Sequence, residues 1–189
     1  MGHRELLLSA ARRCLEQRGY ARTTARDLVA ESGTNLASIG YHFGSKEALL
    51  NQALMGAFAE YTDQLLAVAA GSSEPETGPL GQLRQAWTVM AEQFADMRPL
   101  LIAFVEAMAQ AERAPELRAQ LADGYERLRA TIAAAITGMH PGLPADQART
   151  AASFMIGVCD GLMVQWLLDP ERAPTGADAF DAASLIFTQ

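Results

Sequence analysis

The chain has 189 residues, half of them hydrophobic, which is enough for one large domain or for a small domain joined to a larger one. The formal net charge of −7 argues at first against a nucleic-acid partner, but the charge is unevenly spread. Residues 1–50 hold seven basic and five acidic side chains, whereas the rest holds eight basic and 17 acidic ones. A mildly basic head on an acidic body suits a chain that docks DNA with one end only.

The composition also disfavours an enzyme, a redox protein and a membrane protein. The three histidines show no metal-ligand spacing, and no nucleophile or phosphate-loop motif is present. Cys14 and Cys159 each lie in an apolar helical pattern, which favours buried thiols over a redox pair. No N-terminal signal sequence is seen, and the most apolar later run, residues 155–168, is too short to span a bilayer. We expect a cytoplasmic protein with no metal, no cofactor, no catalytic residue and no membrane partner.

Three short helices are predicted in the first 50 residues. The first covers residues 4–18, where apolar side chains share one face and Gly19 follows. Thr24 is a good N-cap for the second helix, and Asp27 stands three residues on, where a capping-box acid belongs. Gly33 ends that helix because glycine adopts the positive φ of a C-cap. Either Thr34 or Asn35 then caps the third helix, which ends near residue 44.

A pair of helices joined by a tight glycine turn indicates a helix-turn-helix, whose second helix fits the DNA major groove. This stretch resembles the DNA-binding domain of the TetR/AcrR family of transcriptional regulators. The resemblance covers about the first quarter of the chain and rests on Gly19-Tyr20, Thr23-Thr24, Arg26-Asp27-Leu28, Ser32-Gly33, Tyr41-His42-Phe43 and Ser45-Lys46-Glu47-Ala48-Leu49-Leu50.

The resemblance implies which residues meet DNA. Side chains on the second motif helix fall near base edges, where amide and hydroxyl groups form hydrogen bonds and small apolar groups touch a thymine methyl. Residues around it, including Lys46, the only lysine in the chain, look like phosphate contacts. The predicted DNA-binding residues are Thr24, Arg26, Asn35, Leu36, Ala37, Ser38, Gly40, Tyr41, His42 and Lys46.

The remainder of the chain reads as helix throughout. A long helix from about residue 46 to 70 is followed by a Gly-, Ser- and Pro-rich loop over 71–81. Further helices are predicted over residues 83–97, 99–111, 116–137, 145–168 and 177–187, with Pro99 opening one of them. The expected fold is all-α with about nine helices: an N-terminal three-helix helix-turn-helix domain, residues 1–47, and a larger helical ligand-binding and dimerisation domain, residues 48–189.

Aromatic and methionine side chains recur at helical spacing in this body. Such a stripe is more often core than ligand site, because burial of large apolar groups is the default. The family resemblance, however, implies a small-molecule site inside the body, for which adaptable methionine and aromatic linings are suitable. The predicted ligand-binding residues are Met55, Phe58, Tyr61, Trp87, Met90, Phe94, Phe104, Met108, Tyr125, Phe154 and Val158.

Gly157 and Gly161 share a face of the helix predicted over 145–168, and a helix-interior glycine costs about 1 kcal/mol relative to alanine. Close helix–helix approach is a reason to keep them. The resemblance implies dimerisation through the last two long helices. A wall of the ligand pocket or ordinary packing within the chain is the alternative. The predicted interface residues are Gly157, Gly161, Leu162, Gln165, Trp166, Phe180 and Phe187.

Taken together, these patterns predict a ligand-responsive transcriptional regulator. The resemblance favours a repressor that binds a palindromic double-stranded operator as a homodimer and is released by a small apolar effector. The alternatives are a constitutive DNA-binding regulator, or an activator, without a small-molecule effector.

Overall fold

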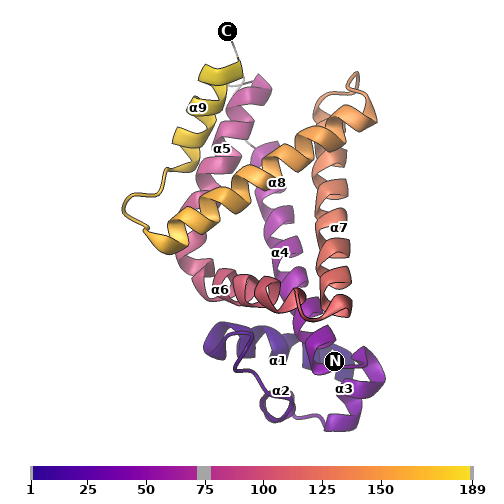
Figure 1. The fold of residues 1–189 in the computed structure, drawn as a ribbon. Coiled ribbons are helices and arrows are strands. Elements are labelled where there is room, and N and C mark those ends of the chain that lie inside the picture. The colour runs from indigo at the N-terminus through magenta and orange to yellow at the C-terminus, as the bar shows by residue number, and fades with distance from the viewer. Residues whose placement is uncertain (1, 72–77, 188–189) are drawn as a thin grey trace. The chain divides into compact units, whose positions relative to one another are not determined.

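The computed structural model describes residues 2–71 and 78–187, and every regular element in these ranges is an α-helix (Figure 1). The expectation of an all-α chain with about nine helices is therefore confirmed for the described residues. The helices are α1 His3–Arg18, α2 Ala25–Ser32, α3 Leu36–Phe43, α4 Lys46–Gly71, α5 Gly78–Glu92, α6 Phe94–Ala111, α7 Pro115–Met139, α8 Ala145–Leu168 and α9 Gly176–Phe187. The loop predicted over 71–81 falls mainly on residues 72–77, outside the described ranges.

The boundary between α5 and α6 differs from the prediction. The sequence placed a break before Pro99, but α6 begins at Phe94 and contains Pro99 within its second turn. The break lies at Gln93, whose amide donates to the carbonyls of Val89 and Met90. The apolar spacing of Trp87, Met90 and Phe94 continues across this break, so periodicity alone does not reveal it.

The described chain packs as two compact units. The first contains the residues up to Glu60 together with Met97–Tyr125, and the second contains Tyr61–Asp96 and the residues from Glu126 onward. The first unit is thus larger than the head predicted over residues 1–47. It joins α1, α2 and α3 to the first part of α4, most of α6 and the start of α7.

The core of the first unit is built from leucines at helical spacing. Leu7 and Leu15 lie on one face of α1 and are fully buried, as are Leu28 of α2 and Leu49 and Leu54 of α4. Removing a leucine side chain from water contributes roughly 1.5–3 kcal/mol, so these positions fix the packing of the three short helices. The buried face of α1 meets both α2 and α3.

The second unit is held by two sets of contacts. In the first set, α5 packs against α9 and against α8, and Arg84 of α5 forms an ion pair with Asp181 of α9 at 3.0 Å. In the second set, Ile136 of α7 is buried with Ala148 and Ala152 of α8. Helix α8 therefore packs against two different helices of the unit, α5 and α7.

Helix α8 carries much apolar surface. It is 24 residues long, and by length and composition alone it could cross a membrane, with 22% of its most apolar stretch buried inside the protein. This corrects the expectation, made from residues 155–168 only, that the apolar run is too short to span a bilayer. The core helix of a soluble protein can pass the same test, but most of this stretch is not buried. An apolar helix that its own chain covers so little is expected to have a partner.

Candidate functional site

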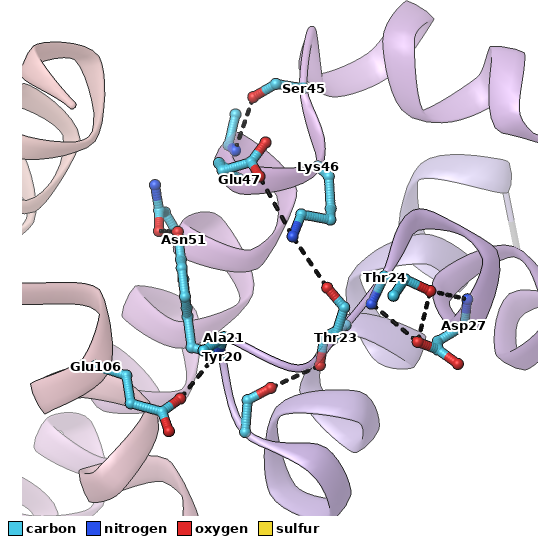
Figure 2. A network of polar contacts seen from close by, with 12 residues as sticks. Tyr20, Ala21, Thr23, Thr24, Asp27, Ser45, Lys46, Glu47, Asn51 and Glu106 are labelled. Carbon is cyan, nitrogen blue, oxygen red and sulfur yellow. Dashed lines mark hydrogen bonds and ion pairs between the residues drawn. The ribbon is translucent and has the colours of Figure 1, made fainter. Parts of the chain in front are cut away.

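The start of α2 is fixed by a reciprocal cap (Figure 2). The Thr24 hydroxyl accepts from the Asp27 amide at 3.2 Å, and the Asp27 carboxylate accepts from the Thr24 amide at 2.9 Å. The Thr24 hydroxyl also donates to the Asp27 carboxylate at 2.6 Å, and this hydrogen bond, together with that from the Thr24 amide, lowers the pKa of Asp27; Arg18 at 3.3 Å lowers it further. Gly33 follows α2 at φ +65°, a left-handed conformation that favours glycine. The predicted cap, acid and stop of α2 are all confirmed.

Helix α3 begins at an asparagine cap. The side-chain oxygen of Asn35 accepts from the Ser38 amide at 3.0 Å and lies 3.2 Å from the Ser38 hydroxyl, so Asn35 rather than Thr34 is the cap. Ser38 is 8% exposed, and its hydroxyl also lies 3.2 Å from Nδ1 of His3 at the start of α1. Both side chains predicted to form hydrogen bonds with base edges therefore have structural partners inside the head.

The solvent face of α3 carries the other predicted base-contact residues. Leu36 is 56% exposed and Tyr41 is 85% exposed, with Ala37 and Gly40 exposed between them. His42 is half-buried with its ring 4.8 Å from that of Tyr41. A leucine and a tyrosine this exposed on one short helix leave most of their apolar surface open to a ligand such as DNA.

Two basic side chains were predicted to reach phosphates, and their surroundings differ. Arg26 on α2 is exposed and has no hydrogen bond or ion pair among the described residues. Lys46, in contrast, donates from Nζ to the carbonyl of Thr23 at 3.0 Å and lies 3.3 Å from the Glu47 carboxylate (Figure 2). Of these two cations, Arg26 is thus exposed without an internal partner in the described part of the chain, whereas Lys46 already makes internal contacts.

A polar network connects the α1–α2 turn to helices far along the chain (Figure 2). The buried Tyr20 hydroxyl donates to Oδ1 of Asn51 in α4 at 2.6 Å, and Nδ2 of Asn51 donates to Oε1 of Gln120 in α7 at 2.7 Å. The next amide, that of Ala21, donates to the Glu106 carboxylate of α6 at 3.0 Å. Burial is the main cause that raises the pKa of Tyr20 well above its ordinary value. The sequence did not predict this network, because its members are up to 85 residues apart.

The predicted ligand-binding residues fall in both units. In the first unit the ring of Phe104 lies 5.3 Å from Phe58 and 6.1 Å from Tyr125, and Met55 packs against Gly124 of α7. Met108 of the same unit is 48% exposed. The aromatic side chains of Phe58, Phe104 and Tyr125 therefore form one row from α4, α6 and α7.

The second unit brings together the other predicted ligand residues. Trp87, Met90 and Phe94 are each at most 5% exposed, and the Tyr61 hydroxyl donates to the carbonyl of Met90 at 2.9 Å. Burial raises the pKa of Tyr61, with a smaller contribution from the Cys159 thiol. Val158 is half-buried, and Phe154 is 48% exposed at the surface of α8 rather than inside.

The predicted interface residues divide into surface and core. Gly157, Gly161 and Gln165 are exposed, and no heavy atom lies within 4 Å of where a Cβ on either glycine would stand. Leu162, in contrast, is 4% exposed and belongs to the core of its own chain.

The two aromatic interface candidates also pack internally. Trp166 lies against Phe94 at 5.8 Å, and Phe180 lies against Trp87 at 6.3 Å. The side chain of Phe187 lies outside the described part of the structure. Sequence reasoning missed four exposed apolar residues on α8 and α9: Val164, Leu168, Leu185 and Ile186.

The thiols and acidic groups offer little other chemistry. Cys14 and Cys159 are both free, and burial raises the pKa of Cys159 to about 12. Among the described residues, no group of three or more His, Cys, Asp or Glu side chains could hold a metal ion.

The chain matches two protein-family profiles. Residues 7–53 match the profile described as bacterial regulatory proteins, tetR family, and residues 79–183 match that of the BetI-type transcriptional repressor, C-terminal. The chain is 31% identical over 179 residues to the HTH-type transcriptional regulator TtgR of Pseudomonas putida, which covers 89% of this chain and 81% of TtgR. It is 27% identical over 173 residues to BetI of Agrobacterium fabrum, covering 92% and 80%.

Solved structures show the same fold. The multidrug binding protein EbrR in complex with imidazole superposes with a TM-score of 0.68 at 26% identity and covers 98% of this chain and 95% of EbrR. GusR of Salmonella enterica superposes with a TM-score of 0.66 at 19% identity, covering 99% and 96%. The exposed recognition helix, both family profiles and the curated relatives agree: the chain is a transcriptional regulator, not an enzyme, and it belongs to the TetR family.

Proposed function

We propose that this regulator is a cytoplasmic repressor that binds a palindromic operator as a homodimer and leaves it when a small apolar effector binds. The observation that carries the DNA part of the proposal is the solvent face of α3. It presents Leu36 and Tyr41 to solvent, beside Arg26, which has no hydrogen bond or ion pair within the described ranges. A capped two-turn helix with such a face is suited to the major groove, where a leucine can touch a thymine methyl.

The repressor part draws on relatives. The C-terminal profile is that of a BetI-type transcriptional repressor, and it matches more than half of the chain. A second structure of EbrR, at 24% identity and a TM-score of 0.64, is a complex with proflavin, a flat aromatic dye. The buried Trp87, Met90 and Phe94 of the second unit are consistent with an apolar body that binds compounds of this size.

The homodimer is supported by apolar surface on α8 and α9. Leu168, Leu185 and Ile186 are each at least 70% exposed, and Gly157 and Gly161 have open space above them. Exposed apolar residues on the last two helices, with glycines that permit a close approach, fit a second copy of the same chain. Two copies present two α3 helices, and two half-sites about one DNA turn apart give useful specificity.

Release requires a connection between the effector and α3. Helix α4 is continuous from the first unit into the second. The α1–α2 turn is hydrogen-bonded to Glu106 of α6 and, through Asn51, to Gln120 of α7. An effector that moves these helices therefore alters the support of the head. A tenfold loss of DNA affinity requires about 1.4 kcal/mol of coupling, and DNA must weaken effector binding by the same factor.

The DNA part can be tested with duplexes selected from a random pool. Binding to a selected duplex should weaken steeply with salt, because phosphate contacts release counterions. Arg26→Gln should weaken binding to selected and scrambled duplexes alike and reduce the salt slope by about one per protomer. Leu36→Ala should instead relax the preference at one base position in each half-site, by about 1–3 kcal/mol if the contact is direct. Equal effects of the two variants on both duplexes would contradict this assignment.

The effector part needs a separate measurement. Fluorescence anisotropy of a labelled, selected duplex is followed while a broad set of apolar compounds is added. Release of DNA with a saturable dose response supports the repressor proposal. If DNA binding is specific but no compound releases it, the alternative from the sequence stands, which is a constitutive regulator or an activator without an effector.

A further inference from the structure

Trp87 of α5 carries a buried polar group that has no partner in the described part of the protein. The residue is 3% exposed, yet its indole Nε1–H has no hydrogen-bond partner among the described residues. More than nine in ten buried polar groups in folded proteins have a partner, because an unsatisfied buried donor destabilises the protein by about 1–3 kcal/mol. A buried donor without a partner is therefore expected to meet an acceptor that is not part of the described chain.

The indole is held in place. The backbone of Gly176, the first residue of α9, packs so closely on the Trp87 carbonyl that a Cβ there would collide with it. Phe180, one turn later on α9, meets the indole edge to face at 6.3 Å. One turn earlier on α5, Arg84 makes two hydrogen bonds to Asp181, at 3.0 and 3.1 Å. A ring fixed in this way is a pre-organised donor, which loses little conformational entropy when it meets an acceptor.

Phe180 of α9 packs on the Trp87 ring, and Met90, one turn later on α5, is 5% exposed. An acceptor-bearing molecule at the indole N–H would therefore meet aromatic rings, which pack well against other rings, and one open donor. A compound with only donors would leave that indole N–H unsatisfied.

We propose that the effector of this regulator is a mainly aromatic compound with a hydrogen-bond acceptor, such as a carbonyl oxygen, and that this acceptor accepts a hydrogen bond from the Trp87 indole N–H. The inference rests on the proposed function, because it specifies the chemistry of the effector in the second unit. Trp87 thereby sets specificity: it favours acceptor-bearing ligands over their hydrocarbon analogues.

The probes are fluorenone and fluorene, which share one flat three-ring frame and differ in a ketone against a methylene group. The wild-type protein should bind fluorenone about two- to tenfold more tightly, the range expected for one net neutral hydrogen bond. Trp87→Phe keeps an aromatic ring and removes the donor, so it should bind both compounds equally. Trp166→Phe is the matched control and should retain the preference for the ketone.

A second measurement follows the indole N–H signals of the wild-type protein and uses a variant only to assign them. The chain has two tryptophans, so two indole N–H signals appear in a ¹⁵N-correlated NMR spectrum, and either variant assigns them. The Trp87 signal should move downfield with fluorenone and change less with fluorene. This readout does not depend on the folding of Trp87→Phe, because Trp166→Phe also identifies the signal.

Three results of the binding measurement would overturn the inference: equal affinity of the wild type for both probes, a ketone preference that survives in Trp87→Phe, or no binding of either probe. An unmoved Trp87 signal would mean that water or a protein group already accepts its proton, which also overturns it. The proposed function fails separately, when no compound of the broad set releases DNA. Release by other compounds without any role for Trp87 leaves that function standing.

Discussion

At the scale of single residues, the structure changes the interpretation of the two side chains that seemed best suited to read bases. Asn35 uses its oxygen to cap α3, and Ser38 is buried between Asn35 and His3. Alanine at Asn35 would remove a cap, worth about 0.5–2 kcal/mol, as well as any base contact. Leu36 is the cleaner position for testing base recognition, because nothing in the described head depends on its side chain.

Tyr20→Phe should destabilise the first unit by about 1–3 kcal/mol. The substitution keeps the ring but leaves Oδ1 of Asn51, a residue that is 2% exposed, without its hydrogen bond. Urea unfolding followed by circular dichroism measures the change. Tyr41→Phe is the control, since Tyr41 is 85% exposed and should change stability by less than about 0.5 kcal/mol. An equal, small effect of the two substitutions would show that the buried amide finds another donor.

At the scale of elements, the cap of α2 should make the head sensitive to acid. Hydrogen bonds with Thr24 hold the pKa of Asp27 below that of an unfolded chain, about 3.9. The carboxylate therefore stabilises the head fully above that pKa, and this contribution is lost as the pH falls through the lower folded-state value. Asp27→Asn should be less stable than wild type at pH 7 and should converge with it near pH 2.

Thermal unfolding of both proteins between pH 2 and 7 tests this. The difference between them isolates Asp27 from the other carboxylates, which titrate in both proteins. A stability gap that stays constant over this range would show that the charge of Asp27 does not contribute, and that only its hydrogen bonds matter.

At the scale of the whole molecule, the proposed dimer depends on apolar residues that the chain itself leaves uncovered. Leu185→Glu places a charge where the side chain is 71% exposed, so it should leave the protomer folded and weaken association by well over tenfold. Sedimentation or light scattering at micromolar concentration gives the mass, and operator affinity should fall with it. Val105→Glu on α6 is the control, because it introduces the same charge at a position that is 42% exposed. Leu8→Glu would be a poorer control because Leu8 is half-buried. Loss of the dimer in both variants would point to a general effect of charge.

The local structure of the head could be predicted from residues that are close together in the sequence. Thr24 with Asp27, and Gly33 at the turn, act within four residues, so caps and stops follow directly from residue type. The long apolar periodicity of the body likewise predicted helices and their number. Pro99 was misleading because it lies inside α6 rather than in its first turn, where proline is usually tolerated, and the apolar period did not change at the true break.

Only the tertiary structure decided which groups lie together. The contacts from Asn51 to Gln120 and from Ala21 to Glu106 join residues 69 and 85 positions apart, and no periodicity encodes such pairs. The same holds for the exposed Leu168 and Leu185, and for the buried donor of Trp87, which a sequence reads simply as apolar. Residue type and spacing set what each helix is, because the forces that form a helix act over one or two turns. Exposure and unpaired polar atoms depend on which helices meet, and that is a property of the folded chain.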